Sequence, residues 1–306
     1  MSSPLKIHIL GCHSASPKAN AFPTAQIVEI RNQLIMVDCG EGTQVRLRQQ
    51  KIKFNNIKHI LISHLHGDHF FGLIGFLSTL SLLNRQASLQ IFAPKGAKEI
   101  IMLQLKFSKT SLSFPLKFNV LESENSEEII NNSKFRVQTI PLNHRIYTNG
   151  FLITEKPAKK KLNIEKVEKL PISKAYYNKI VNGEDIVLDN GHKIANEELT
   201  LPPDPVKSYA YCSDTAFKPD IVPLIKNSTV LYHESTFLEI DEDLCKKTKH
   251  STAKQAGIIV AKAEVGYLIL GHYSARYKNL DAFKQEAKTV FEPVSIAESG
   301  KTYMFK

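Results

Sequence analysis

Side chains that can bind metal ions crowd one short segment of the chain, and these are His64, His66, Asp68 and His69. Imidazole and carboxylate groups suit zinc, which typically takes three or four such ligands. His64 and His66 are two residues apart, so in an extended segment their side chains point the same way. Asp68 and His69 lie beyond the bend expected at Gly67 and can face a second point. The segment could be a solvated polar turn, but its composition favours two metal ions about 3.5–4 Å apart, as in two-metal hydrolases.

Two metal ions need more ligands than this segment supplies, and the chain offers further candidates beyond its predicted strands. These are His144 after residues 134–140, Asp214 after 208–213 and His272 after 267–271. Open α/β folds place their sites beyond the carboxyl ends of strands. Each residue alone could be a surface polar group, but together with the first segment they indicate a two-metal site.

Strands and helices alternate around these residues. The apolar stretch 59–63 predicts a buried strand that ends directly before His64, and an apolar helix is expected from Phe70 to Leu83. A hairpin is expected around Arg31-Asn32, between strands at 25–30 and 33–38. Further strands are predicted at 6–10, 89–93, 116–122 and 229–235, and further helices at 42–50, 96–107 and 251–263. The pattern favours an α/β fold with two similar β-rich halves, roughly 1–155 and 207–306.

Composition places the chain among ordinary globular proteins. It has 306 residues, of which 42% are hydrophobic and 23% are charged. No stretch approaches the roughly 18 apolar residues of a membrane helix, and residues 1–10 show no signal peptide. The cysteines lie far apart and predict neither a disulfide framework nor a cysteine zinc site: Cys12, Cys39, Cys212 and Cys245. We therefore expect a cytoplasmic protein with no membrane segment.

Positive charge is partly concentrated in one segment. The formal net charge is +10, which favours polyanionic partners, although a generally lysine-rich proteome would give the same total. Residues 155–180 hold eight lysines against three glutamates. The surrounding segment 156–206 has poor periodicity and several prolines. It is interpreted as an insertion or arm outside the core.

Several segments resemble those of the ribonuclease Z family of the metallo-β-lactamase superfamily, in the order in which that family has them. Residues 64–69, HLHGDH, resemble the HxHxDH hallmark of the superfamily. The segments that resemble ribonuclease Z itself are DCGEGTQ (38–44), SHLHGDHFFGL (63–73), CSDT (212–215), HESTF (233–237), HSTAKQA (250–256) and GHYSARY (271–277).

The resemblance implies a metallo-β-lactamase-type αββα four-layer sandwich. Residues 1–306 would form a single domain of this fold, and 156–206 would be an inserted, protruding basic arm that grips tRNA. The resemblance also implies two Zn²⁺ per chain. One would be held by His64, His66 and His144, the other by Asp68, His69 and His272, with Asp214 bridging the two.

The implied reaction is removal of the 3′ trailer from precursor tRNA by phosphodiester hydrolysis, which leaves a 3′-hydroxyl on the tRNA. Asp68 would orient or deprotonate the attacking water. His250, held by Glu234, would protonate the leaving oxygen; the alternative is that His250 only caps the helix that follows. The family also implies a homodimer. Asp38 is expected to be a buried carboxylate that fixes loop geometry.

Phosphate contacts are expected from the loop 11–23 and from residues 274–276, whose Arg276 could bind phosphate with a bidentate fork. Two other functions remain open. One is a phosphodiesterase of the same fold that acts on a small ester or cyclic nucleotide. The other is a metal-free RNA-binding subunit. The basic arm favours a nuclease over the first, and the clustered ligand types argue against the second.

Overall fold

The computed structural model describes residues 3–188, 190–202 and 204–306, which divide into two compact units. The larger unit comprises residues 3–154 and 207–306, and residues 155–206 belong to the smaller one. The segment predicted as an insertion, 156–206, coincides with the smaller unit.

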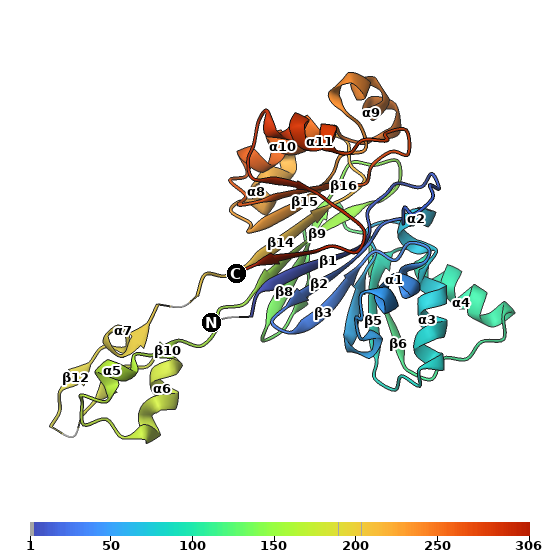
Figure 1. Ribbon diagram of the computed structural model, residues 1–306. Coiled ribbons are helices and arrows are strands. Elements are labelled where there is room, and N and C mark those ends of the chain that lie inside the picture. Colours follow the sequence, from blue (N-terminus) through green and yellow to red (C-terminus); the bar gives the residue numbers. More distant parts are fainter. Residues whose placement is uncertain (1–2, 189, 203) are drawn as a thin grey trace. The chain divides into compact units, whose positions relative to one another are not determined.

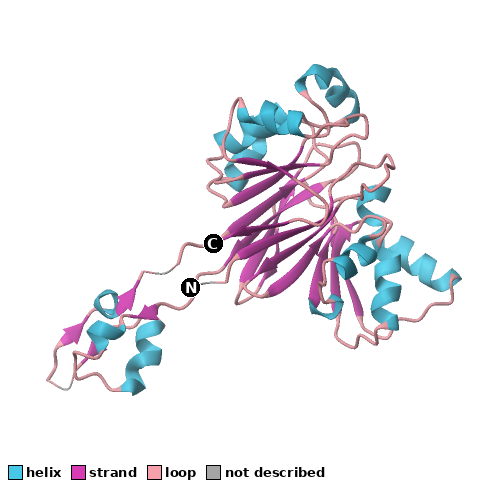
Figure 2. Ribbon diagram, in the orientation of Figure 1, coloured by secondary structure: helices cyan, strands magenta, loops and turns pink. Residues whose placement is uncertain are grey.

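Two sheets pack face to face in the larger unit, and helices cover their outer faces (Figures 1 and 2). The first sheet has the order β18-β1-β2-β3-β4-β5-β6, with β1 (Leu5–Gly11), β2 (Ala25–Ile30), β3 (Gln33–Val37), β4 (Ile57–Leu61), β5 (Leu89–Pro94), β6 (Leu116–Leu121) and β18 (Thr302–Phe305). The second has the order β17-β16-β15-β14-β9-β8-β7, with β7 (Glu128–Asn131), β8 (Phe135–Pro141), β9 (Asn149–Glu155), β14 (Ser208–Cys212), β15 (Val230–Glu234), β16 (Leu268–Gly271) and β17 (Val294–Ile296).

The helices divide between the two sheets. The first sheet is covered by α1 (Thr43–Gln49), α3 (Leu73–Leu82) and α4 (Ala97–Phe107), and the second by α8 (Val222–Ile225), α10 (Ala253–Lys262) and α11 (Asp281–Lys288). Two more helices are α2 (Gly67–Phe70), after β4, and α9 (Glu242–Thr248), before α10. The predicted αββα layering is therefore confirmed. The predicted helix 70–83 is two helices. Phe71 and Gly72 between them keep helical φ and ψ angles, but the N–H of Gly72 donates to the carbonyl of Cys39 and does not continue the helical hydrogen-bond pattern.

Alternating side chains on the strands supply two separate apolar cores. Ile27 on β2 and Met36 on β3 join Phe76 of α3 in the core between the first sheet and its helices. Their neighbours Val28 and Ile35 point the other way, into the core between the sheets. Burial of each such side chain contributes about 1.5–3 kcal/mol to folding. Because successive side chains point to opposite faces, the first sheet packs against its helices on one face and against the second sheet on the other.

The predicted hairpin between β2 and β3 is confirmed. Its two turn residues, Arg31 and Asn32, have φ values of 50° and 59°. Positive φ at both positions is the signature of a type I′ turn, whose twist matches that of the flanking strands.

The two β-rich halves predicted from the sequence do not each form their own sheet. β18, at the C-terminal end, pairs with β1 in the first sheet. β7, β8 and β9, from the first half of the chain, join the second sheet. Each half therefore completes the sheet of the other, a property of long-range pairing that local periodicity does not contain.

Residues 155–206 pack around a small apolar core of their own. Its elements are β10 (Lys161–Leu162), α5 (Ile164–Val167), α6 (Tyr177–Val181), β11 (Ile186–Val187), β12 (Lys193–Ile194), α7 (Asn196–Leu199) and β13 (Thr200–Leu201), and its buried side chains are Val167, Ile180, Ile186, Ile194 and Leu199. The segment therefore lies outside the two main cores, in keeping with its interpretation as an insertion or arm, but it has a small core that the sequence did not predict. Its longest helix, α6, has only 5 residues, which is too short to show a helical period.

Two sequence-based expectations concern the cysteines and the membrane. All four cysteines are free thiols with buried side chains. Within the described ranges, no helix combines the length and the apolar character needed to cross a bilayer.

Candidate active site

The predicted site residues follow strands whose carboxyl ends meet at one edge of the sandwich. Asp38 follows β3, Asp214 follows β14 and His272 follows β16. All three have left-handed backbones, with φ of 57°, 61° and 62°. Such φ values are uncommon outside glycine and cost about 1–3 kcal/mol, and they cluster where the fold must aim a side chain. The chain turns sharply at each strand end, and the side chains converge.

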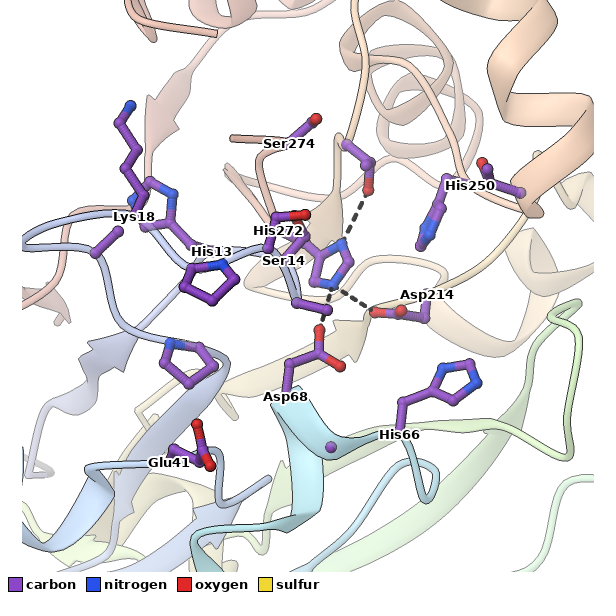
Figure 3. Close-up of a pocket in the computed structure, with 18 of the residues that line it drawn as sticks. His13, Ser14, Lys18, Glu41, His66, Asp68, Asp214, His250, His272 and Ser274 are labelled. Atoms are coloured by element: carbon purple, nitrogen blue, oxygen red, sulfur yellow. Dashed lines mark hydrogen bonds and ion pairs between the residues drawn. The ribbon is translucent and has the colours of Figure 1, made fainter. Parts of the chain in front are cut away.

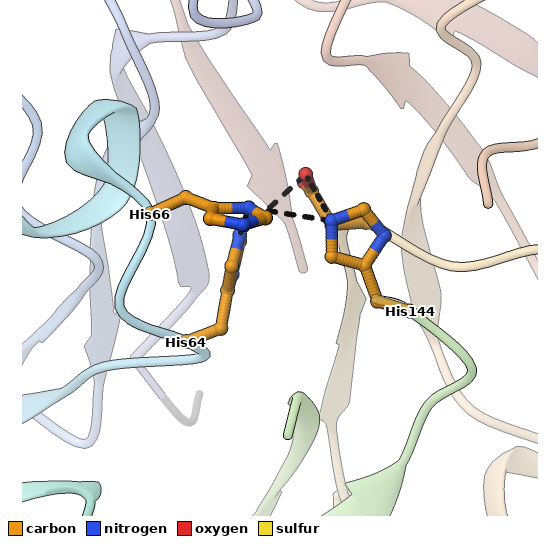
Figure 4. Close-up of side chains that lie close together, drawn as sticks. His64, His66 and His144 are labelled. Carbon is orange, nitrogen blue, oxygen red and sulfur yellow. Dashed lines mark hydrogen bonds and ion pairs between the residues drawn. The ribbon is translucent and has the colours of Figure 1, made fainter. Parts of the chain in front are cut away.

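His64, His66 and His144 form one cluster with Asp214 (Figure 4). The Nε2 atom of His64 lies 3.0 Å from Nδ1 of His66, which lies 3.3 Å from Nε2 of His144. The Oδ2 atom of Asp214 lies 3.6 Å from the His64 nitrogen and 3.8 Å from that of His144.

Asp68, His69 and His272 form a second cluster beside the first. The Nε2 atoms of His69 and His272 lie 3.4 Å apart, and they lie 3.5 and 3.4 Å from Oδ2 of Asp68. Asp214 joins this cluster through its other oxygen, Oδ1, at 3.1 Å from His69. The same oxygen lies 3.2 Å from His272 (Figure 3). The structure thus brings all the predicted ligand residues together, and Asp214 presents one carboxylate oxygen to each cluster.

The charge of Asp214 is held in place by its surroundings. Burial alone would raise the pKa of this carboxyl, but the neighbouring His272, His69 and His64 outweigh it and hold the pKa well below its usual range. Asp214 is therefore a carboxylate with both oxygens able to accept.

Hydrogen bonds behind the clusters select the tautomers of His64 and His69. Asp38 accepts from the Ser63 hydroxyl at 2.9 Å, so that hydroxyl is free to accept from Nδ1–H of His64 at 3.0 Å. Asp38 also accepts from Nδ1–H of His69 at 2.7 Å and from the Tyr211 hydroxyl at 2.6 Å. Asp38 is fully buried, as predicted. It orients the imidazole of His69 directly and that of His64 through Ser63.

Hydrogen bonds also select the tautomers of His272 and His144. The Thr236 hydroxyl donates to Glu234 at 2.6 Å and therefore accepts from Nδ1–H of His272 at 2.9 Å. The backbone carbonyl of Lys249 accepts from Nδ1–H of His144 at 3.0 Å.

Nε2 lone pairs of four imidazoles therefore face the carboxylate oxygens of Asp68 and Asp214. Lone pairs aimed at one another in a buried space repel unless a cation lies between them. The donor set and this orientation fit metal ions of the zinc type, and each ligand has the outer hydrogen bond that such sites require.

Two close contacts explain the glycines that flank the ligand segment. A Cβ atom on Gly72 would lie 1.9 Å from the carbonyl oxygen of Gly40, and one on Gly40 would lie 2.4 Å from that of Asp68. Cys39 joins the same two segments, because its N–H donates to the carbonyl of His69 and its own carbonyl accepts from the N–H of Gly72. The DCG segment thus braces the turn that carries Asp68 and His69.

His250 lies against the second cluster and is paired with Glu234. Its Nδ1 atom donates to Glu234 at 2.8 Å, and its ring stacks on that of His272 at 5.2 Å between centroids. Burial opposes the charge of His250, but attraction to Glu234 and the hydrogen bond prevail and raise its pKa to about 9. The capping alternative fails, because Thr252 is the N-cap of α10 and forms a capping box with Gln255.

The clusters open into a cavity of about 770 Å³. The predicted phosphate-binding loop lines it through residues such as His13, Ser14 and Lys18, and Ser274 also lines it (Figure 3). Arg276 is not among the lining residues, because its guanidinium pairs with Asp241 at 3.2 Å.

Two residues that line this cavity were missed in the sequence, Phe71 and Arg145. Phe71 lies two residues after the predicted ligand His69, and Arg145 directly follows the predicted ligand His144. Position beside a ligand was the only signal that could have identified them.

Comparisons with known proteins identify relatives over the whole chain. Proteins named ribonuclease Z from Bacteroides fragilis and Cytophaga hutchinsonii are 42% and 44% identical over 293 and 299 residues. These matches cover 96% and 97% of this chain and 96% and 95% of the relatives. The family model of the anti-Pycsar protein Apyc1 matches residues 5–164.

Solved structures share the fold. Human tRNase Z, short form, matches with a TM-score of 0.70 and 24% identity, covering 98% of this chain and 99% of that one. The metallo-β-lactamase fold protein YhfI from Bacillus subtilis matches with a TM-score of 0.68 and 20% identity, covering 99% of both chains.

The two packed sheets and the paired His/Asp clusters at their edge define an enzyme of the metallo-β-lactamase fold. The curated relatives match almost the full length, whereas the Apyc1 model ends at residue 164. The chain belongs to the ribonuclease Z family, and it is a hydrolytic endoribonuclease of this fold.

Proposed function

We propose that this protein removes the 3′ trailer from precursor tRNA with two Zn²⁺ per chain and leaves a 3′-hydroxyl on the tRNA. The observation that carries the proposal is the carboxylate of Asp214, whose oxygens face two separate clusters at 3.1–3.8 Å. The relatives' name, ribonuclease Z, and the likeness to a structure named tRNase Z support the choice of RNA substrate.

Each cluster would hold one zinc ion, and Asp214 would be a ligand shared by the two. The first ion is assigned to His64, His66 and His144, and the second to Asp68, His69 and His272. Ions of this kind would supply Lewis acidity. This lets a water molecule lose its proton near neutral pH and so become a nucleophile, and it offsets negative charge on the phosphate.

Asp68 orients the attacking water. Burial would raise the pKa of its carboxyl, but in the metal-free protein a protonated His69 and hydrogen bonds with His272 and His69 hold that pKa far below its usual range. A carboxylate of such low basicity is a poor proton acceptor, so accurate placement of the water is its main contribution.

His250 is the general acid. The product carries a 3′-hydroxyl, so the bond that breaks joins phosphorus to the 3′ oxygen of the tRNA body, and that oxygen needs a proton. His250 lines the cavity, and its raised pKa of about 9 keeps it protonated at neutral pH. Glu234 steadies the ring and is itself held by N–H groups of Thr215, Thr236 and Ser251.

Residues 155–206 are proposed to bind the body of the tRNA as an exosite. Several lysines of this unit are exposed to solvent: Lys159, Lys161, Lys166, Lys169, Lys174 and Lys179. Cations of this kind bind phosphates without reading sequence. We further propose that the enzyme is a cytoplasmic homodimer, an arrangement implied by the resemblance to the family.

Cleavage assays test this function against its main alternative, a phosphodiesterase for small esters or cyclic nucleotides. Precursor tRNA with a 3′ extension and bis(4-nitrophenyl) phosphate are incubated separately with the enzyme, and the RNA ends are mapped. We expect one cut at the start of the trailer, with a 3′-hydroxyl on the tRNA. Turnover of the small ester alone would favour the alternative.

A further inference from the structure

We propose that Phe71 is a stacking platform for a nucleobase next to the scissile phosphate, which would make it a substrate-positioning residue of this enzyme. The inference rests on the proposed function, because it assumes an RNA strand in the cavity. It adds to that function a contact with a base, whereas the exosite and the metal ligands would contact phosphates only.

Phe71 has no evident role in holding the fold together. Its side chain is 59% exposed, although its neighbour Phe70 is only 2% exposed and packs in the core with Leu73. Exposure of a phenyl ring forgoes about 1.5–3 kcal/mol of burial. The residue lies in the short break between α2 and α3, where the chain turns from the ligand segment toward the core.

The ligand segment itself supports the ring of Phe71. A Cβ atom on Gly67 would lie 2.6 and 2.7 Å from ring carbons Cε2 and Cδ2. Gly67 lies between His66 and Asp68, one from each cluster. With glycine at this position the ring of Phe71 packs directly against the backbone that carries the proposed ligands, and a larger residue would displace the ring.

The cavity that Phe71 lines also holds two cations, Arg145 and Lys18. Its carboxylates are Glu41 and the proposed ligands Asp68 and Asp214. Cations that follow the phosphates, combined with an exposed aromatic face for the bases, are the standard combination for binding single-stranded nucleic acid. A trailer cut at a defined phosphate must place the flanking bases within this cavity. Phe71 is the aromatic side chain that lines it beside the ligands and is largely exposed.

Abasic substrates test the proposal. Single-turnover kcat/KM is measured for wild type and Phe71→Ala on intact precursor tRNA and on two versions lacking one base, immediately 5′ or 3′ of the scissile phosphate. A stacked base contributes about 1–3 kcal/mol, so Phe71→Ala should lower kcat/KM about 5- to 150-fold on intact RNA. Removing the stacked base should cost wild type a similar factor. On that substrate the variant should lose nothing further.

Matched variants separate stacking from other causes. Phe71→Leu keeps an apolar side chain without a π face and should also lose activity, whereas Phe71→Trp should retain it. Phe107→Ala removes a ring that is 77% exposed on α4, away from the cavity, and should behave as wild type. Zinc content and circular dichroism report whether the variants fold.

Equal losses for Phe71→Ala on all three substrates, or no loss on intact RNA, would overturn the platform. Full activity of Phe71→Leu would do so too. Failure of wild type to cut intact precursor tRNA would instead refute the proposed function.

Discussion

Glu234 accepts a hydrogen bond from Nδ1 of His250 at 2.8 Å, and its carboxylate is completely buried. The same carboxylate accepts from the Thr236 hydroxyl, which in turn orients His272. One buried charge therefore serves both the proposed acid and a proposed metal ligand.

The pKa of His250 should depend on Glu234. In metal-free protein, NMR titration of the His250 ring should give a pKa of about 9. Glu234→Gln should lower this pKa, because burial is then opposed only by the weaker attraction to Asp214. The raised pKa also links to stability. The ion pair contributes fully below the unfolded value of 6.5 and is lost as pH rises through about 9. The Tm of metal-free wild type should therefore fall between pH 6.5 and 9 more than that of Glu234→Gln, and equal slopes would speak against the pair.

Replacement of His250 should remove acid catalysis and leave the metals. His250→Ala is expected to slow cleavage about 10²- to 10⁴-fold. A precursor with sulfur in place of the bridging 3′ oxygen has a leaving group that needs no proton, so the variant should lose little with it. Because His250 also lies within reach of Asp214 and His272, zinc content is the control. A drop in zinc would make His250 a ligand.

The Thr236 hydroxyl should tune metal affinity. Thr236→Val removes the acceptor for His272 Nδ1–H, and loss of such an outer partner typically weakens metal binding 10- to 100-fold. Competition with a zinc chelator measures the change. Thr302→Val is a matched control. The Thr302 hydroxyl makes the same kind of hydrogen bond, at 2.9 Å to Nδ1 of His8, but this bond is exposed and involves no proposed ligand. Unchanged affinity in Thr236→Val would show that this bond does not support the site.

The exposed lysines of residues 155–206 should act on tRNA alone. Joint replacement of Lys159, Lys166, Lys169 and Lys174 by glutamine should raise KM for precursor tRNA and flatten its dependence on salt, because fewer counterions are released on binding. Hydrolysis of bis(4-nitrophenyl) phosphate should be unchanged. The control is replacement of three exposed lysines of the larger unit, Lys98 and Lys106 on α4 and Lys109 just after it. Equal damage to both substrates would indicate a structural role.

Much of the site could be predicted from sequence because its residues follow strands. His64, His144, Asp214 and His272 each come within a few residues of the end of a predicted strand, and the strand ends of packed sheets meet at one edge. For Phe71 and Arg145 the sequence offered only their position near a predicted ligand, since exposure in the cavity depends on the surrounding surface. The pairing of β18 with β1 is equally invisible to local periodicity, because its register is set by residues almost 300 positions apart.

The most direct test of the account is the number of zinc ions bound by wild type and by Asp214→Asn. An asparagine offers only one acceptor oxygen in place of the two that Asp214 presents. Elemental analysis should find about two zinc ions per wild-type chain, fewer in the variant, and a matching loss of RNA cleavage. A wild type that cleaves precursor tRNA without bound metal, or an Asp214→Asn variant with unchanged zinc and activity, would contradict the paired-metal site.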